Sequence, residues 1–159
     1  MLYSEEYLEI QKKLHKNAGY GMSAGKHSDL VKNSGYKDIL DYGCGKCSLQ
    51  YGLGFAINNY DPAIERYKDN NHPHDFVYCG DVLEHIEPDC LDAVLLDIKR
   101  CAKKSALLII STRPAKRILP DGRNAHLIVK DAEWWHNKLS EFFDIKKQRV
   151  VNGEYLAWV

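Results

Sequence analysis

Ile39-Leu40-Asp41-Tyr42-Gly43-Cys44-Gly45-Lys46-Cys47-Ser48 is the stretch of sequence that decides the fold. It predicts a short buried strand, followed by a glycine turn and the start of a helix. A turn of this kind presents backbone N–H groups to a polar or anionic ligand. Gly43 and Gly45 permit positive φ angles and a close approach of the backbone to that ligand. Asp41 ends the strand, where its carboxylate could accept hydrogen bonds from an amine.

Three motifs carry a resemblance to a known family. The run from Asp41 to Gly45 resembles the first motif, Asp/Glu-x-Gly-x-Gly, of class I S-adenosylmethionine (SAM)-dependent methyltransferases. Asp61 follows 20 positions later, where that family places its ribose-binding carboxylate. The run Gly80-Asp81-Val82-Leu83-Glu84-His85-Ile86 is similar to the segment after the family's fourth strand. Because the motifs come in the family's order, the chain is identified as a compact member of it.

The resemblance implies a SAM site. Asp41 and the backbone at Gly43 and Gly45 would hold the methionine end of the cofactor, and Asp61 would bind the ribose hydroxyls. Asp81 lies at the end of the neighbouring strand, beside the cofactor. The residues that we assign to the cofactor are Asp41, Tyr42, Gly43, Cys44, Gly45, Tyr60, Asp61, Asp81 and Val82.

A nicotinamide-binding Rossmann unit is the competing interpretation of the glycine turn. That motif requires Gly-x-Gly-x-x-Gly, and its third glycine position is here Ser48. The Val-Leu-Glu-His segment has no counterpart in such a dehydrogenase. We therefore favour the methyltransferase.

Length and composition bound the class of protein. A chain of 159 residues with 45% hydrophobic residues is expected to form one domain with a substantial core. Its 22 basic and 22 acidic residues give zero formal net charge, which argues against strong non-specific DNA binding. No apolar run is long enough to cross a membrane, and the N-terminus lacks the form of a signal peptide. We expect a cytoplasmic protein. The sequence does not indicate its oligomeric state.

The five cysteines do not have the spacing of a disulfide framework, and we interpret them as reduced thiols. Cys44 and Cys47 form a Cys-x-x-Cys pair inside the glycine turn. A zinc site would need two further ligands, and the sequence has no second pair. Small residues fitted to a tight turn are the simpler explanation.

The pattern of elements predicts an α/β protein with a Rossmann-like, doubly wound sheet in the order 2-1-4-5-7-6, its last strand antiparallel. We expect a single domain over 1–159, made of an N-terminal helical lid (1–35) and a catalytic core (36–159). Tyr20, Met22 and Lys26 are candidates for lid residues over the cofactor, although ordinary packing explains them equally well. The expected strands are 39–42, 55–60, 75–80, 106–111, 143–151 and 155–159, and the expected helices are 4–19, 23–33, one short helix after Gly45, one or two turns over 63–69, 88–104 and one from Asp131.

One departure from the family follows the second strand. The polar run Asn70-Asn71-His72-Pro73-His74 leads directly into a strand that matches the family's fourth, because the Val-Leu-Glu-His segment comes next. We therefore expect the third strand and its helix to be missing. The usual contact from that strand to the adenine would then be lost. The adenine would lean on residues near Tyr60, Asp61 and Asp81, or be more exposed.

His85 and His126 are the candidates for deprotonating a methyl acceptor, because histidine titrates near neutral pH. Together with Asp81 and Glu84 they follow two adjacent strands, so all four could bind a divalent ion such as Mg²⁺ or Mn²⁺. This set resembles the Glu-x-x-Glu-His plus His of metal-dependent O-methyltransferases of small-RNA 3′ ends and of ubiquinone biosynthesis, with Asp81 in place of the first Glu. Metal-free relatives also contain the Val-Leu-Glu-His pattern, so the metal is a hypothesis.

Four cations, Arg113, Lys116, Arg117 and Arg123, lie in the loop after the fifth strand. They favour an acceptor with phosphate or carboxylate groups, although a solvated loop would have the same composition. We expect a methyltransferase acting on an oxygen or nitrogen of a small-molecule, nucleotide or RNA-like acceptor. The alternative is a non-catalytic SAM-binding protein or partner subunit with the same fold.

Overall fold

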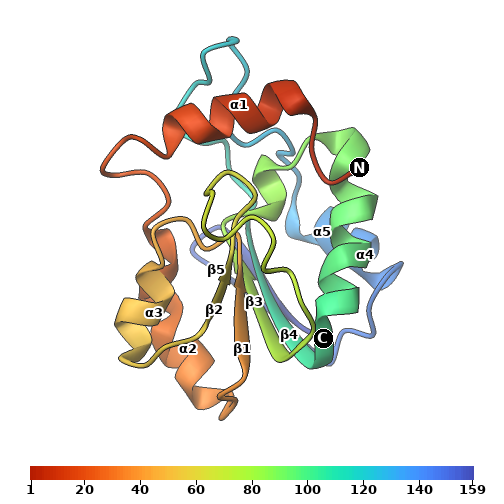
Figure 1. Ribbon diagram of the computed structural model, residues 1–159. Coiled ribbons are helices and arrows are strands. Elements are labelled where there is room, and N and C mark those ends of the chain that lie inside the picture. Colours follow the sequence, from red (N-terminus) through yellow and green to blue (C-terminus); the bar gives the residue numbers. More distant parts are fainter.

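Six strands form one sheet in the order β2-β1-β3-β4-β6-β5 in the computed structural model, which describes residues 1–159 (Figure 1). β6 pairs antiparallel with β4 and β5, and the other pairs are parallel. When the missing third strand is counted, this order is 2-1-4-5-7-6, so the predicted topology is confirmed. The strands are β1 (Ile39–Tyr42), β2 (Asn58–Tyr60), β3 (His74–Gly80), β4 (Ala102–Ser111), β5 (Lys147–Val151) and β6 (Glu154–Trp158).

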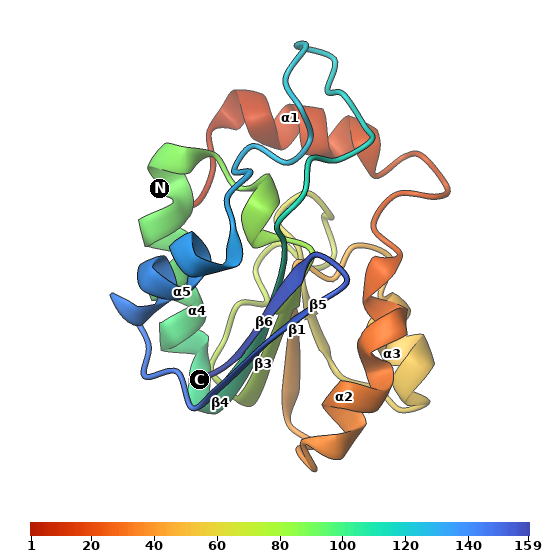
Figure 2. The ribbon, with the colours of Figure 1, turned by 180° about the vertical axis from the view of Figure 1, so that it is seen from behind.

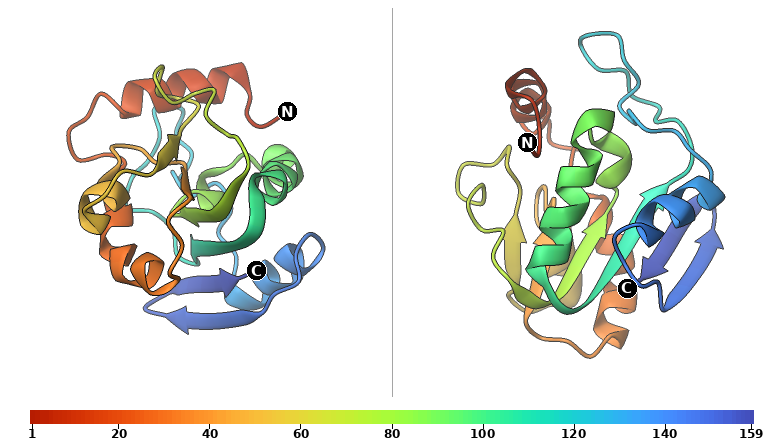
Figure 3. Two further views of the ribbon diagram at one scale, coloured as in Figure 1. Left: turned by 60° about the horizontal axis from the view of Figure 1, so that its bottom comes forward. Right: turned by 90° about the vertical axis from the view of Figure 1, so that its right-hand side faces the viewer.

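Helices cover both faces of the sheet (Figure 3, left). α2 (Ser28–Asn33) and α3 (Ser48–Leu53) pack on one face, and α4 (Leu91–Cys101) and α5 (Ala132–Ser140) on the other. α1 (Glu5–Leu14) crosses the edge where the parallel strands end, as Figures 1 and 2 show from opposite sides. Three short 3-10 helices, Ser23–His27, Leu83–His85 and Pro88–Cys90, complete the elements. None of the helices has the length and apolarity of a membrane span.

Alternation along the strands divides the core between the two faces. Leu40 of β1 belongs to the apolar cluster on the α4–α5 side, whereas its neighbour Ile39 belongs to the cluster on the α2–α3 side. Every residue of β4 from Ala106 to Ile110 is fully buried, as expected for a strand between two layers of helices. Trp135 and Leu139 of α5 pack in the first cluster, as ordinary core residues.

Several predicted boundaries are wrong. α1 ends at Leu14, well before Gly19, and the second predicted helix begins with a 3-10 turn. β4 begins at Ala102, so Lys103 and Lys104 belong to a strand and not to the end of the preceding helix. The reason is pairing with β3, which starts at His74 opposite Ala102 and places Lys104 Nζ 2.7 Å from Asp75 Oδ2. Residues 63–69 form hydrogen-bonded turns rather than a helix, and β2 contains only 58–60.

The third strand is absent, as expected from the sequence. β2 is the edge of the sheet, and residues 61–73 run directly from it to β3. This connection is tied to α4 by the Asn71 side chain, which donates to Asp97 Oδ2 at 2.9 Å. Arg100 donates in turn to the Asn71 carbonyl at 2.7 Å.

The glycine turn after β1 packs directly against the loop that follows α1. Gly43 and Gly45 have φ angles of 81° and 51°, in the left-handed region. The amide of Lys46 donates to the Gly21 carbonyl at 2.8 Å. A Cβ at Gly45 would lie 2.5 Å from the Gly21 carbonyl oxygen, so only glycine permits this contact.

Replacing Gly45 by alanine should therefore both destabilise the protein and displace the loop at Gly21. Gly35→Ala is the matched control, because Gly35 also has a positive φ but has no atom within 4 Å of its Cβ position. Both variants should lose about 1–2 kcal/mol to backbone strain, and Gly45→Ala should lose more. Urea unfolding measures the difference, and equal losses would contradict the importance of the Gly21–Gly45 contact.

Candidate active site

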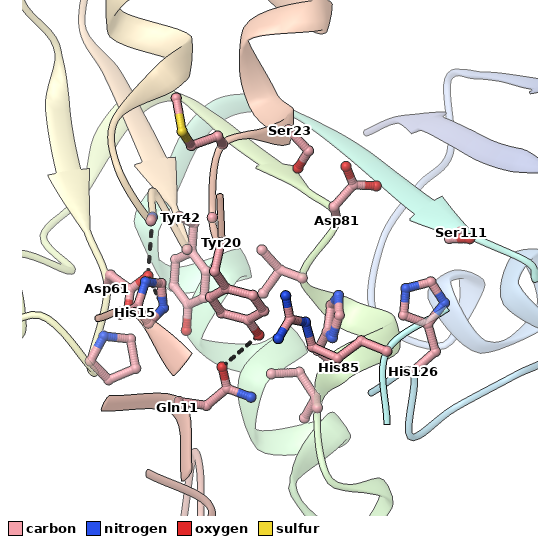
Figure 4. Close-up of a pocket in the computed structure, with 18 of the residues that line it drawn as sticks. Gln11, His15, Tyr20, Ser23, Tyr42, Asp61, Asp81, His85, Ser111 and His126 are labelled. Carbon is pink, nitrogen blue, oxygen red and sulfur yellow. Dashed lines mark hydrogen bonds and ion pairs between the residues drawn. The ribbon is translucent and has the colours of Figure 1, made fainter. Parts of the chain in front are cut away.

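A cavity of about 510 Å³ lies beneath α1, at the carboxyl ends of the parallel strands (Figure 4). Most of the residues that the sequence singled out line it: Tyr42, Gly43, Gly45, Tyr60, Asp61, Asp81, Val82, His85 and His126. Asp41, Cys44 and Glu84 are buried beneath this surface. The strand ends therefore bring the three sequence motifs to one site, as the carboxyl edge of an open α/β sheet usually does.

Asp61 joins the glycine turn to the end of β2. Its Oδ2 accepts a hydrogen bond from the Gly45 amide at 3.1 Å, and its Oδ1 accepts one from the Ala63 amide at 2.9 Å. Asp41 lies below the turn, and its Oδ2 is buried without a hydrogen-bond partner. Burial raises the pKa of Asp41 well above its usual range. Cys44 and Cys47 are free thiols with their sulfur atoms 4.0 Å apart.

The end of α1 contributes residues that the sequence interpretation missed. His15 is the C-cap of α1, and its Nε2 lies 3.6 Å from Asp61 Oδ2. Burial lowers the pKa of His15 despite the neighbouring carboxylate. Gln11, one turn earlier, accepts a hydrogen bond from the Tyr20 hydroxyl at 2.8 Å. Gln11 and His15 line the cavity, and Gln11 Nε2 and His15 Nδ1 are buried without a hydrogen-bond partner. Their i, i+4 spacing could have been read as one helix face.

Asp81 points toward the N-terminal region and away from His85 (Figure 4). Its φ of 56° is left-handed, which is uncommon for a residue other than glycine. Its carboxylate lies 3.3 Å from Lys26 Nζ, and Lys26 also pairs with Glu154 at the start of β6. Of the predicted lid residues, Tyr20, Met22 and Lys26 all line the cavity. Glu154 was not predicted, because only the antiparallel insertion of β6 brings it here.

His85 and His126 share one hydrogen-bonding arrangement. His85 Nδ1 donates to the Ala125 carbonyl at 2.8 Å, and His126 Nδ1 donates to the Arg113 carbonyl. A carbonyl can only accept, so both Nδ1 atoms carry hydrogen, and no group of the protein forms a hydrogen bond with either Nε2. Burial, with the nearby His126, lowers the pKa of His85 to about 4, which keeps its ring neutral at pH 7. The two ring centroids are 4.7 Å apart.

Glu84 completes a group of possible metal ligands. Its side chain is fully buried, its Oε1 accepts from the Ser111 amide at 2.9 Å, and its Oε2 has no partner. Burial raises the pKa of Glu84 to about 8. Ligand atoms of Glu84, His85 and His126 lie within 4.8 Å of one another. An unpartnered carboxylate oxygen and two imidazoles oriented by backbone carbonyls fit a divalent ion. Asp81 is not part of this group.

The basic loop places two of its four cations at the cavity. Arg113 and Arg117 line it without forming an ion pair, and the Arg117 guanidinium lies 5.4 Å from the centre of the Tyr20 ring. Arg123 instead pairs with Asp121 at 2.6 Å, and Lys116 is exposed outside the cavity. The side of the cavity near His126 therefore carries unpaired positive charge.

Comparison with known proteins gives a family and a fold. A family model described as a methyltransferase domain matches residues 5–159. No curated protein sequence matches the chain.

Solved structures with the same fold include the complex of DhpI with SAH (TM-score 0.66, 15% identity, covering 98% of this chain and 97% of that one). Another is the 1,6-didemethyltoxoflavin-N1-methyltransferase of Burkholderia thailandensis with 1,6-didemethyltoxoflavin and S-adenosylhomocysteine (TM-score 0.67, 14% identity, covering 99% of this chain and 90% of that one). A third is an rRNA methylase from Escherichia coli (TM-score 0.58, 12% identity, covering 98% of this chain and 75% of that one). At these identities the likeness concerns the fold.

Proposed function

Since the chain belongs to the methyltransferase domain family, we propose that it transfers the sulfonium methyl group of SAM to an oxygen or nitrogen of an anionic small-molecule or nucleotide-like acceptor. The observation that carries this proposal is the hydrogen bond between Gly45 and Asp61, which unites the two cofactor motifs at one cavity. Solved structures with this fold contain SAM or S-adenosylhomocysteine. SAM is the cofactor that these features support.

In this mechanism the main task of the protein is to position the cofactor and the acceptor. Methyl transfer is an in-line displacement on an already activated methyl group, so orientation and exclusion of water supply most of the acceleration. The backbone at Gly43 and Gly45 would hold the methionine end, and Asp61 would accept hydrogen bonds from the ribose hydroxyls. The acceptor would then lie toward His85 and His126, on the far side of the cavity from Asp61 (Figure 4).

We further propose that Glu84, His85 and His126 hold a divalent cation. Their free Oε2 and Nε2 atoms support this role, because no hydrogen bond within the protein uses them. When bound, the ion would act as a Lewis acid on the acceptor oxygen. In the metal-free protein the two imidazoles face the cavity, where either could form a hydrogen bond with the acceptor.

The unpaired cations support an acidic acceptor. Arg113 lines the cavity next to His126, and Arg117 lines it beside the Tyr20 ring; both belong to the loop after β4. Guanidinium groups recognise carboxylate and phosphate in a bidentate manner. A phosphate or carboxylate on the acceptor would therefore be bound at the mouth of the cavity.

Calorimetric titration with SAM and S-adenosylhomocysteine tests the cofactor. Asp61→Ala should weaken binding by roughly 10- to 100-fold, which corresponds to a lost charged hydrogen bond of about 1.5–3 kcal/mol. Asp61→Asn, which retains an acceptor for the Gly45 amide, separates ligand binding from loss of the turn. Asp144→Ala is the control, because Asp144 is exposed and does not line the cavity. Release of S-adenosylhomocysteine with an acceptor mixture distinguishes an enzyme from a non-catalytic SAM-binding protein.

Calorimetric titration with Mn²⁺ tests the proposed cation site. Purified protein should bind Mn²⁺ in calorimetry after EDTA treatment, and the His85→Ala/His126→Ala variant should not. His72→Ala, which alters an exposed histidine, should bind as the wild type does. Methyl transfer that survives both EDTA and the double substitution would exclude this role.

Charge reversal tests the acceptor. Arg113→Glu and Arg117→Glu should raise the KM for the acceptor by about 10-fold or more, since each replaces an attractive charge by a repulsive one. The Kd for SAM should stay nearly constant. Arg149→Glu on exposed β5 is the matched control. An unchanged KM would remove the support for an anionic acceptor.

A further inference from the structure

The absent third strand leaves one side of the cavity without its usual wall. β2 ends at Tyr60, and the next residues, Asp61 and Pro62, line the cavity. Beyond them the chain forms only turns before β3. A ligand whose ribose is bound at Asp61 therefore needs another segment of the protein to enclose its base.

The N-terminal segment occupies this side of the molecule. It lies beside the upper end of α4, next to the connection between β2 and β3 (Figure 3, right). Ser4 donates from its backbone amide and from its hydroxyl to the carboxylate of Glu87, each at 2.8 Å. The Tyr7 hydroxyl donates to the His85 carbonyl. These bonds hold a segment that is usually mobile when nothing ties it down.

Leu2 and Tyr3, which precede Ser4 in the sequence, line the cavity. Leu2 also packs against the main apolar cluster. Tyr3 and Tyr60 both line this cavity. The apolar residues that line the cavity include Leu2, Tyr3, Tyr42, Tyr60, Ile86 and Val94.

Two tyrosines that line the cavity, Tyr42 and Tyr60, are the last residues of β1 and β2. The rings of Tyr42 and Tyr60 have centroids 4.8 Å apart and planes inclined by 57°. The Tyr42 hydroxyl is held by Asp97 Oδ2 at 2.9 Å, in the same network that fixes Asn71. The rings are thus positioned before any ligand arrives.

We propose that Leu2 and Tyr3 form, with Tyr42 and Tyr60, the slot for the adenine ring of the cofactor, in place of the missing third strand. This inference rests on the proposed function, because the ribose at Asp61 directs the base to this side. Adenine is planar, aromatic and uncharged at neutral pH, so apolar and aromatic walls suit it. Stacking of a base on an aromatic side chain is worth about 1–3 kcal/mol.

Calorimetry with three ligands tests the slot. Tyr3→Ala should weaken binding of S-adenosylhomocysteine and of 5′-methylthioadenosine by about 5- to 100-fold. It should leave S-ribosylhomocysteine, which lacks the base, at its wild-type affinity in competition experiments. Tyr3→Phe should restore binding because it keeps the ring. Tyr51→Ala is the control, since Tyr51 of α3 is 76% exposed.

The outcomes are distinguishable. Wild-type protein that binds none of the three ligands would overturn the proposed function and this inference together. Wild-type binding of S-adenosylhomocysteine that Tyr3→Ala leaves unchanged would overturn the adenine slot alone. Equal weakening of all three ligands by Tyr3→Ala would assign Tyr3 a purely structural role. Leu2→Ser gives the same test if Tyr3→Ala proves unstable in thermal unfolding.

Discussion

The hydrogen bond from the Gly45 amide to the Asp61 carboxylate is the interaction on which the cavity depends. It connects the turn after β1 to the end of β2, and the amides of Gly43 and Cys44 reinforce it by donating to the Tyr60 carbonyl at 2.8 and 2.9 Å. The parallel register places Tyr42 opposite Tyr60, so both strands end at the same level. The two parts of a cofactor site are thereby held in one rigid unit. The loop at Gly21 then closes over that unit.

The cavity has two chemically different sides. Near Asp61 it offers a carboxylate, the ring of His15 and apolar walls. Near His126 it offers two imidazoles with free Nε2 atoms and the unpaired cations Arg113 and Arg117. Asp81 stands between the two sides, where Lys26 neutralises it. An acidic group bound beside Arg113 would thus meet a charge of opposite sign.

The topology was predictable because the three motifs mark the ends of β1, β2 and β3, and because β4 contains a continuous apolar run from Ala106 to Ile110. The start of β4 was not, since Lys103 and Lys104 continue a helical charge pattern and only pairing with β3 makes them a strand. Gln11 and His15 share one face of α1 by their spacing, but only tertiary packing turns that face, and Glu154 of β6, toward the cavity. The direction of Asp81 depends on its left-handed backbone. For that reason the sequence grouped Asp81 with Glu84, whereas the structure pairs it with Lys26.

The connection that replaces the third strand also covers part of the sheet's open edge. An open strand edge exposes unpaired backbone groups that can template pairing with another chain. β2 has only three residues, and the Asn70 side chain donates to the Asn59 carbonyl at 3.1 Å. This side chain occupies the position of an incoming strand. At the opposite edge, β5 displays Lys147 and Arg149, whose charges repel a second copy of the same edge. One edge strand of the sheet is therefore short and partly capped, and the other carries two positive charges.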